Sequence, residues 1–294
     1  MAQASTRQCG SVGDFEREWA EALACGGGRW LVCPTDSPST QAKLDEQIKA
    51  AQVRDVLHAA GLTQGLALEC GCGAAGMSVY MADLGFRSVA CDISMNALRL
   101  ARLNAACHLN QQSIERFSMA RGNVFTLPFG DASFDLVASY GLLEHFAPGV
   151  LDQVLGEMLR VVRPGGMVIA DIVPGCFSVR TLGMWVNLLG SLAAHALTLR
   201  WRRLPALPAA YLDSLYENEL EAEAWAEALR GAGLRDVQVR VNRPFPPLAL
   251  SGWPERLYVR LLQRVRPLWE WFDRAQPGWG RRWGWMYLAW GTKP

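Results

Sequence analysis

A glycine-rich turn between two short apolar segments most constrains what this sequence can fold into. The run Leu66-Ala-Leu-Glu-Cys-Gly-Cys-Gly-Ala-Ala-Gly76 has the pattern of a buried strand, a tight turn and the start of a helix. Val89-Ala-Cys-Asp92 has the pattern of a second strand that ends in an acid. Glycines let the backbone approach a ligand closely, and α/β sheets bind nucleotide-type cofactors at the carboxyl ends of parallel strands. The sequence therefore predicts a cofactor site at this turn.

The residues around the turn favour one cofactor over another. Gly71-x-Gly73-x-x-Gly76, with Asp92 about twenty residues further on, also matches the dinucleotide fingerprint. However, Glu69 stands at the strand tip, where a carboxylate repels a pyrophosphate and attracts an ammonium group. S-adenosylmethionine (SAM) carries an ammonium, a sulfonium and ribose hydroxyls but no phosphate, and Asp92 can accept both hydroxyls. These residues favour SAM over a nicotinamide dinucleotide.

Three later segments extend the pattern: Gly122-Asn-Val-Phe-Thr-Leu-Pro-Phe-Gly-Asp-Ala-Ser-Phe-Asp-Leu-Val137, Ser139-Tyr-Gly-Leu-Leu-Glu-His-Phe146 and Glu157-Met-Leu-Arg-Val-Val-Arg-Pro-Gly-Gly166. Together with the glycine turn, they resemble the class I SAM-dependent methyltransferases, and within them the type-11 group, over residues 41–173. The resemblance implies an α/β fold with a Rossmann-like, doubly wound, mostly parallel seven-stranded sheet, an antiparallel last strand and helical cap insertions.

The resemblance also implies a set of cofactor-binding residues. They are Glu69, Cys70, Gly71, Cys72, Gly73, Asp92, Ile93, Asn123, Val124 and Tyr140. Two positions depart from the family pattern. The third glycine of the family turn is Ala75, whose methyl group is tolerated if the backbone keeps an ordinary conformation. Asn123 replaces an aspartate that often binds the adenine amino group, and its amide oxygen can still accept that hydrogen bond.

His145 is the candidate catalytic residue. The resembled group repeats Leu-Glu-His at this point, and in some O-methyltransferases of this fold a histidine in this region acts as a base. A structural or substrate-orienting role is the alternative. Residues expected to line the acceptor site are Cys176, Tyr211 and Tyr216. No metal-ligand cluster is visible in the sequence, so we expect no metal.

The chain divides into segments by pattern. Expected helices are 14–24, 41–60, 75–84, 95–109, 149–162 and 218–231. Expected strands are 65–70, 87–92, 115–121, 134–140, 166–173, 235–241 and 284–291. We interpret residues 1–40 as an N-terminal helix and loop that act as a lid over cofactor or substrate. Residues 41–294 form the methyltransferase domain, with cap insertions at about 174–216 and 243–283.

The first insertion contains a long uncharged run. Thr181 to Leu199 has no formal charge if His195 is neutral, and its length is compatible with a membrane span. Its polar residues and two glycines favour instead either a buried cap helix over the substrate site or a helix that lies in a membrane interface.

The second insertion predicts a basic amphipathic helix. Its apolar positions and its arginines recur at helical spacing, and several tryptophans follow. The apolar positions are Leu257, Leu261, Val265 and Leu268, and the arginines are Arg256, Arg260 and Arg264. Arginine and tryptophan suit a membrane interface with anionic head groups. An ordinary amphipathic helix with a solvated arginine face, or arginines that bind an acidic substrate group, are the alternatives.

Composition limits the class of partner. The 294 residues carry a formal net charge of +1, so no nucleic-acid partner is expected. Eight cysteines without a paired metal-ligand pattern, and a start without an apolar signal core, favour reduced thiols in the cytoplasm, with peripheral attachment to the inner membrane surface as an extension.

The expected function is methyl transfer to a small or lipid-like hydrophobic acceptor, with O-methylation preferred over N- or C-methylation. A soluble natural-product methyltransferase with a closed aromatic pocket and a SAM-binding protein without transferase activity are the alternatives. The sequence does not indicate an oligomeric state.

Overall fold

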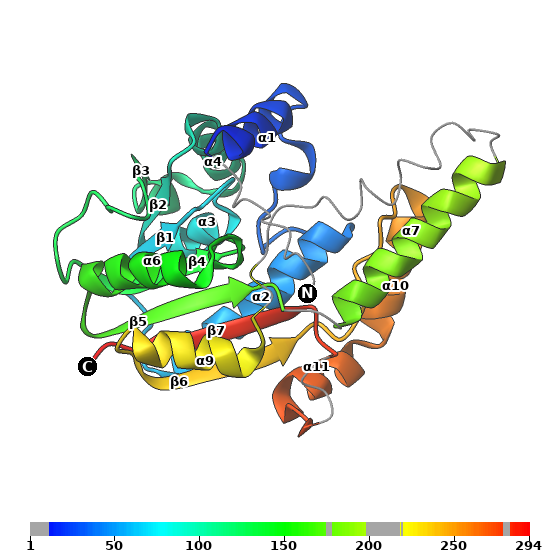
Figure 1. The fold of residues 1–294 in the computed structure, drawn as a ribbon. Helices are drawn as coiled ribbons and strands as arrows, with labels where there is room; N and C mark the ends of the chain where they lie inside the picture. Colours follow the sequence, from blue (N-terminus) through cyan, green and yellow to red (C-terminus); the bar gives the residue numbers. More distant parts are fainter. Residues whose placement is uncertain (1–11, 175–177, 198–217, 219, 279–282) are drawn as a thin grey trace.

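One seven-stranded sheet organises the protein. The computed structural model describes residues 12–174, 178–197, 218, 220–278 and 283–294. The strands are β1 (Leu66–Cys70), β2 (Arg87–Asp92), β3 (Phe117–Arg121), β4 (Phe134–Tyr140), β5 (Val162–Ile172), β6 (Arg235–Asn242) and β7 (Met286–Thr292). Their order is β3-β2-β1-β4-β5-β7-β6, and β7 runs antiparallel to the other six strands (Figure 1). This confirms the predicted Rossmann-like sheet.

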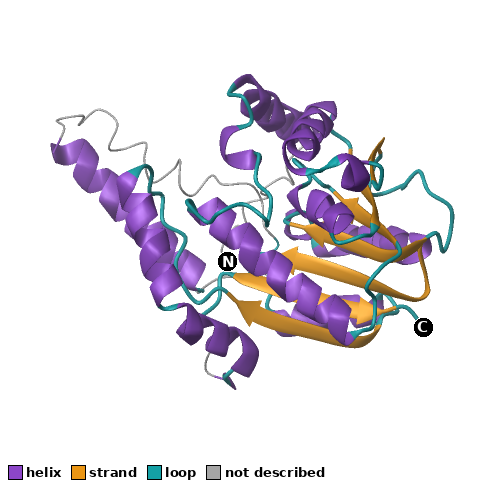
Figure 2. Cartoon of the chain, turned by 180° about the vertical axis from the view of Figure 1, so that it is seen from behind, coloured by secondary structure: helices purple, strands orange, loops and turns teal. Residues whose placement is uncertain are grey.

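Helices cover both faces of the sheet (Figure 2). Those of the core are α1 (Val12–Ala24), α2 (Gln41–Ala59), α3 (Gly76–Asp83), α4 (Met95–His108), α5 (Gln111–Ile114), α6 (Pro148–Val161) and α9 (Ala222–Gly231), with short 3₁₀ turns at Gly28–Trp30 and Leu143–His145. Apolar residues of α6 and α9 pack on one face, and those of α2 and α3 pack on the other. Strands buried on both faces read as continuous apolar runs, which is why the sequence predicted them well.

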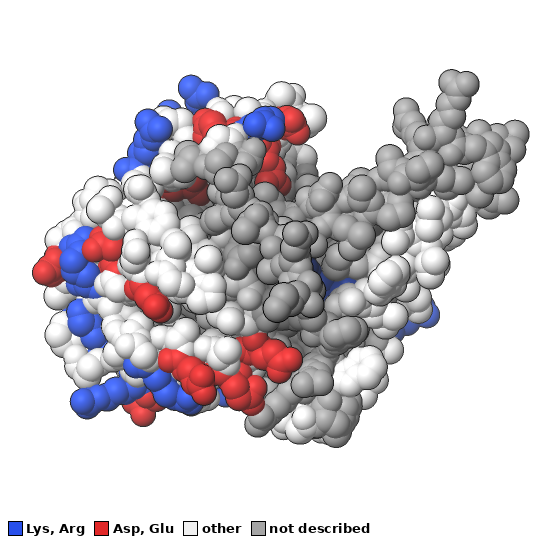
Figure 3. Space-filling view, in the orientation of Figure 1, with Lys and Arg blue, Asp and Glu red and all other residues white. Residues whose placement is uncertain are grey.

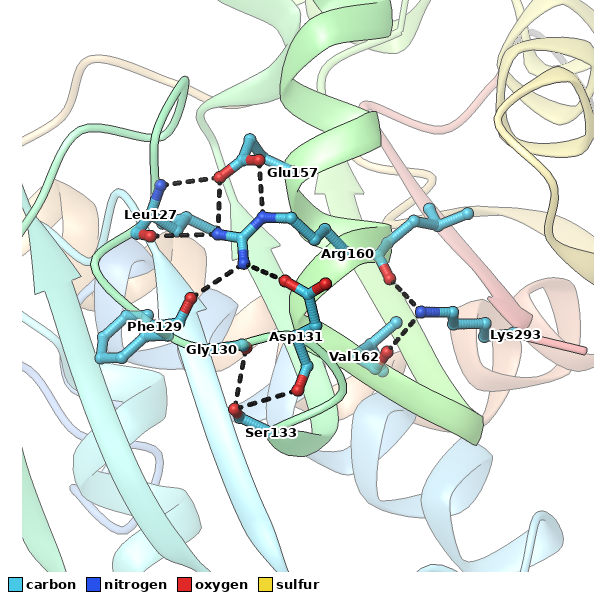
Figure 4. Close-up of polar contacts among 10 residues, drawn as sticks. Leu127, Phe129, Gly130, Asp131, Ser133, Glu157, Arg160, Val162 and Lys293 are labelled. Carbon is cyan, nitrogen blue, oxygen red and sulfur yellow. Dashed lines mark hydrogen bonds and ion pairs between the residues drawn. The ribbon is translucent and has the colours of Figure 1, made fainter.

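Arg160 fastens the loop after β3 to α6. Its guanidinium pairs with Glu157 at 2.8 Å and with Asp131 at 2.7 Å, and it donates to the carbonyls of Leu127 and Phe129 (Figure 4). In the same view, the Lys293 ammonium donates to two carbonyls where α6 passes into β5. These contacts fix the loop that begins at the predicted cofactor side of β3 and join the end of β7 to the core.

Two more helices lie beyond the core sheet and form, with α7, a projecting limb. We define the limb as α7 (Val179–Leu197), residues 243–252, α10 (Trp253–Arg264) and α11 (Arg266–Ala275). Both ribbon views place α7 beside α10 (Figures 1 and 2). Gly183 of α7 lies against Pro247, and the Asn187 amide donates to the Pro247 carbonyl at 3.1 Å. No described helix is both long enough and apolar enough to cross a membrane.

The second insertion differs from the single helix that its pattern predicted. The helix breaks at Val265 because Pro267 has no N–H to continue the ladder, so α10 ends and α11 begins there. Val259, Leu262 and Trp269 are buried in a cluster with Leu44 and Ile48 of α2. The residues of the predicted apolar stripe lie on the other side and are exposed.

Candidate cofactor and acceptor site

Two adjoining cavities open at the carboxyl ends of the central strands. One, of about 350 Å³, is lined in part by Glu69 and is called here the Glu69 cavity. The other, of about 340 Å³, is lined in part by Asp92 and is called the Asp92 cavity. Both share Phe15 and Trp19 of α1, Gly71 of the turn and Gly141 after β4. A ligand held in one cavity can therefore extend into the other past Gly71.

The glycine turn is closed to larger residues on its cavity side. Gly71 and Gly73 have φ values of 67° and 52°, which L side chains rarely adopt. A Cβ at Gly71 would lie 2.6 Å from Leu142 Cδ2, and one at Gly73 would lie 2.8 Å from Trp19 Cη2. Both steric and conformational limits therefore require glycine here.

Ala75 does not meet the condition under which the sequence pattern tolerates its methyl group. It does not keep an ordinary backbone conformation, because its φ of 57° and ψ of 34° place it in the left-handed region at the start of α3. The chain must turn sharply between Gly73 and the helix, and the Ala75 N–H donates to the Cys72 carbonyl at 2.7 Å. An alanine in this conformation costs about 1–2 kcal/mol, which the surrounding turn must offset.

Asp92 is held with acceptor capacity to spare. Its Oδ2 accepts from the Gly73 N–H and its Oδ1 from the Ser94 N–H, both at 2.9 Å. Burial raises its pKa, although these backbone N–H groups act in the opposite direction. Each oxygen keeps a second lone pair, so the carboxylate can still accept two hydroxyls.

The rest of the Asp92 cavity suits a flat, apolar-faced group with one polar edge. Ile93 and Val124, two of the predicted cofactor-binding residues, line it together with Phe125 and Val150. Asn123 also lines it, and its Oδ1 already accepts from the Phe125 N–H at 3.1 Å. A second lone pair of that oxygen remains for an amino group, which is the role predicted for Asn123.

The Glu69 cavity is charged. Glu69 Oε2 accepts from the Ser78 N–H at 2.8 Å and from the Ser78 hydroxyl, so α3 holds the carboxyl in place. Burial raises the pKa of Glu69 to about 7, although Ser78 and Lys49 act in the opposite direction. A cation placed beside this carboxyl would favour its charged form.

Tyr140 lies at the end of β4 and lines the same cavity. Its hydroxyl is buried and has no hydrogen-bond partner among the described residues. Burial raises its pKa well above the ordinary value, so it is a neutral phenol. A buried polar group without a partner is costly, and a bound ligand can supply the missing partner.

His145 ends the 3₁₀ turn after β4 and lines the Glu69 cavity. Its ring packs edge-on against Phe15 of α1, with ring centroids 5.6 Å apart. The predicted candidate base therefore lies in the cavity that also holds Glu69 and Tyr140.

Some predicted site residues lie elsewhere. Cys70 is fully buried in the core beneath the sheet and is not among the residues that line either cavity, because side chains alternate along β1 and its thiol points into the core. Cys72 lines the Glu69 cavity. The three predicted acceptor-site residues, Cys176, Tyr211 and Tyr216, lie outside the described residues.

Sequence reasoning missed two cavity residues on α2. Glu46 and Lys49 line the Glu69 cavity, although α2 precedes the first motif. Their only sequence signal is an opposite-charge pair three residues apart, which is ordinary on an exposed helix face. The structure alone shows that this pair faces the cavity.

Comparison with known proteins defines the class. Residues 68–170 match the family described as a methyltransferase domain. This match identifies residues 68–170 as a methyltransferase domain and, with the seven-stranded sheet and the glycine turn, agrees with the predicted class I SAM-dependent methyltransferase family.

Individual relatives are similar over part of their length. A demethylmenaquinone methyltransferase of Paenarthrobacter aurescens is 31% identical over 181 residues, which cover 59% of this chain and 63% of the relative. A malonyl-[acyl-carrier protein] O-methyltransferase of Pseudescherichia vulneris is 37% identical over 101 residues, which cover 34% of this chain and 36% of the relative. The chain thus spans less than two thirds of the length of these curated relatives.

A solved structure shows the same fold over nearly the whole chain. Magnesium protoporphyrin IX methyltransferase of Synechocystis, with bound S-adenosylhomocysteine (SAH), aligns with a TM-score of 0.54. The alignment covers 96% of this chain and 100% of that protein at 14% identity. At this identity the likeness concerns the fold alone.

Proposed function

We propose that this protein is a SAM-dependent methyltransferase that acts on a lipid-like hydrophobic acceptor at a membrane surface. The observation that carries the proposal is the limb, whose helices expose apolar faces beside unpaired arginines. The domain class and the cavities support the methyl-transfer part. The limb supports the lipid and membrane part.

The cavity residues fit the cofactor. Asp92 has lone pairs for the ribose hydroxyls, Asn123 has one for the adenine amino group, and Glu69 offers a carboxyl for the ammonium. At Gly71 and Gly73 a Cβ would clash with Leu142 and Trp19, so the turn tolerates only glycine at these two positions. When bound, SAM supplies an electrophilic methyl group on a sulfonium, and its sulfur keeps the bonding electron pair as that bond breaks.

His145 is the base in this proposal. An alcohol or phenol acceptor must lose its proton as the new O–CH₃ bond forms, and a neutral imidazole beside it can take that proton. His145 and Tyr140 line the same cavity, and in this proposal the acceptor enters there. This is the reason to prefer O-methylation over C- or N-methylation.

Residues 1–40 act as the lid. Phe15 and Trp19 of α1, together with Trp30, line the Glu69 cavity. Trp19 also packs against Trp30, with ring centroids 5.0 Å apart. Such a lid excludes water from the reacting groups and holds acceptor and cofactor in line, which can supply about 7–11 kcal/mol of the barrier reduction.

The limb carries exposed apolar faces on two helices. On α7, Leu182, Trp185, Val186 and Leu189 follow the i, i+3, i+4, i+7 spacing of one helix face, and 45–62% of each side chain is exposed. On α10 and α11 the exposed apolar residues are Trp253, Leu257, Leu261, Val265, Leu268 and Trp271. Contiguous exposed apolar faces are typical of interaction sites.

Positive charge flanks the apolar surface of α10. Arg256, Arg260 and Arg264 are exposed and make no ion pair with the described residues. In the space-filling view, the described part of the limb is almost entirely white, with blue at its margin and no red visible (Figure 3). An apolar face with a basic border is the pattern of a helix that binds anionic membranes.

The names of the relatives agree with a hydrophobic acceptor without fixing its atom. They include demethylmenaquinone methyltransferases, a ubiquinone/menaquinone biosynthesis C-methyltransferase and an O-methyltransferase that acts on an acyl-carrier protein conjugate. Polyprenyl quinones are lipid-like, so these names support a lipid-like acceptor for this chain.

Vesicle binding tests the membrane part of the proposal. The protein is expected to co-sediment with anionic phospholipid vesicles more than with neutral ones, and salt should loosen the binding. Changing Arg256, Arg260 and Arg264 together to Gln should lower the partition coefficient by on the order of 100-fold, since each arginine contributes about 1 kcal/mol. SAH affinity, measured by calorimetry, should not change.

A matched control separates the limb from net charge. Changing Arg102, Arg230 and Arg235 to Gln removes the same charge from exposed sites on α4, α9 and β6 and should leave vesicle binding nearly unchanged. Leu257→Ser with Leu261→Ser should weaken binding even at high salt. If the unaltered protein ignores anionic vesicles at low salt, the membrane proposal is wrong and the closed, soluble pocket replaces it.

A further inference from the structure

A partly buried pair of opposite charges on α2 enters the cofactor region from outside the matched methyltransferase segment. Lys49 Nζ lies 2.7 Å from Glu46 Oε1 and 3.9 Å from Asp171 Oδ2, and its side chain is only 12% exposed. The ammonium also lies 5.5 Å from the centre of the Tyr140 ring. Burial disfavours the charge, but Glu46 and Asp171 hold the pKa of Lys49 above its ordinary value. Lys49 is therefore a fixed cation at the cavity wall.

The distribution of charge in the Glu69 cavity is uneven. Among its described lining residues, Lys49 is the only lysine or arginine, whereas Glu18, Glu46 and Glu69 are all acidic. Glu46 Oε2 is buried and has no hydrogen-bond partner among the described residues. The cavity thus offers one cation and free carboxylate oxygens on the same wall.

The path of the cofactor leads to this wall. An adenosine held by Asp92 and Asn123 occupies the Asp92 cavity, so the amino-acid arm must pass Gly71 into the Glu69 cavity. That arm ends in an ammonium and a carboxylate. A desolvated zwitterion needs a partner of each sign, since an unpaired buried charge is strongly unfavourable.

We propose that Glu46 and Lys49 form the recognition site for the amino-acid end of the cofactor, with Lys49 binding its carboxylate and Glu46, beside Glu69, binding its ammonium. The proposal rests on SAM as cofactor and not on the identity of the acceptor. Hydrogen bonds to charged groups contribute about 1.5–3 kcal/mol. The arm then supplies the missing partner of Glu46 Oε2, which explains why a buried carboxylate oxygen is left without one.

The test compares two ligands that differ only at this end. SAH carries the amino-acid arm, whereas 5′-methylthioadenosine keeps the adenosine and the thioether but ends in a methyl group. Calorimetry on Lys49→Met is expected to show SAH binding weakened about 10- to 100-fold, with 5′-methylthioadenosine binding changed less than about twofold. Lys49→Arg should restore most of the SAH affinity, because it keeps the cation.

Two further variants guard against a purely structural effect. The double variant Glu46→Gln with Lys49→Met removes one charge of each sign and should fold as well as the unaltered protein while still losing SAH affinity selectively. Lys43→Met is the matched control on the same helix, because Lys43 pairs with Asp36 at 3.4 Å and does not line the cavity. It should leave both ligands unaffected.

Each other outcome overturns the assignment. Equal weakening of both ligands in the double variant would assign the pair a structural role in shaping the cavity. Unchanged SAH affinity with a raised acceptor KM would assign Lys49 to the acceptor. Failure of the unaltered protein to bind either ligand would instead contradict the cofactor itself, which distinguishes the two claims.

Discussion

Replacing His145 by alanine is expected to lower kcat about 10²- to 10⁴-fold, the range for loss of a general base, while SAH affinity stays unchanged. His145 ends the turn after β4, lines the Glu69 cavity and packs against Phe15 of the lid. Because imidazole accepts a proton only in its neutral form, the rate of the unaltered enzyme should fall at acidic pH, and the variant should lose this dependence. Steady-state kinetics across pH provide the measurement.

His58→Ala is the control for this substitution. His58 is exposed near the end of α2, away from the residues that line either cavity, so its loss should not change kcat. Turnover near that of the unaltered enzyme in His145→Ala would show that positioning alone drives the reaction. In that case methylation of a carbon or nitrogen atom, which needs no early proton removal, would explain the kinetics better than O-methylation.

Replacing Arg243 by methionine is expected to destabilise the fold by about 3–5 kcal/mol at neutral pH, the cost of stranding a buried ion partner. Arg243 follows β6, is fully buried, and lies 2.9 Å from Asp45 of α2 and 3.2 Å from Asp171 of β5. Its backbone N–H donates to Asp273 of α11 at 3.1 Å. The Arg243 side chain thus joins the end of β6 to the end of β5 and to α2, and its backbone N–H joins them to α11.

The loss of stability in Arg243→Met should be smaller at acidic pH. Burial raises the pKa of Asp45 to about 6, although Arg243 and Lys49 act in the opposite direction. Without Arg243 that pKa rises further, so the folded state binds more protons than the unfolded chain below neutral pH, and acidification offsets part of the loss. Urea unfolding at about pH 7.5 and about pH 5 measures both values.

Arg240→Met serves as the comparison on the same strand. Arg240 is exposed and stacks over Trp290, with its guanidinium carbon 4.9 Å from the ring centre, a contact that contributes about 0.5–1 kcal/mol. Two results would contradict the role of the buried cluster. One is a loss of unfolding free energy in Arg243→Met no larger than in Arg240→Met, and the other is a loss in Arg243→Met that does not become smaller at acidic pH.

The fold could be predicted because its signals are local. Apolar runs between glycine turns mark strands buried on both faces, and helix caps such as Ser94, whose hydroxyl accepts from the Ala97 N–H at 3.1 Å, mark helix starts. The same local signals placed Glu69, Gly71, Gly73 and Asp92 at the site. The left-handed conformation of Ala75 was not predicted, because only the geometry of the whole turn requires it.

The rest depends on tertiary partners. In α10, two apolar faces compete for burial, and Leu44 and Ile48 of α2 select Val259 and Leu262, which leaves the predicted stripe exposed. The spacing of apolar residues within α10 does not by itself determine which of the two faces is buried. Glu46 and Lys49 were missed for the same reason, because a charge pair on a helix becomes a cavity wall only through the packing of α2 beside the sheet.

Transfer of a labelled methyl group tests the central claim most directly. An extract of the cells that naturally produce the protein, containing membranes and soluble compounds, is incubated with methyl-labelled SAM and either the unaltered protein or Asp92→Ala, and label is counted in the organic and aqueous phases. Asp92→Ala should bind SAM more weakly by about 1.5–3 kcal/mol. We predict label in the organic phase with the unaltered protein and much less with the variant. Label confined to water-soluble products, or no label above that of the variant in either phase, would contradict methyl transfer to a lipid-like acceptor.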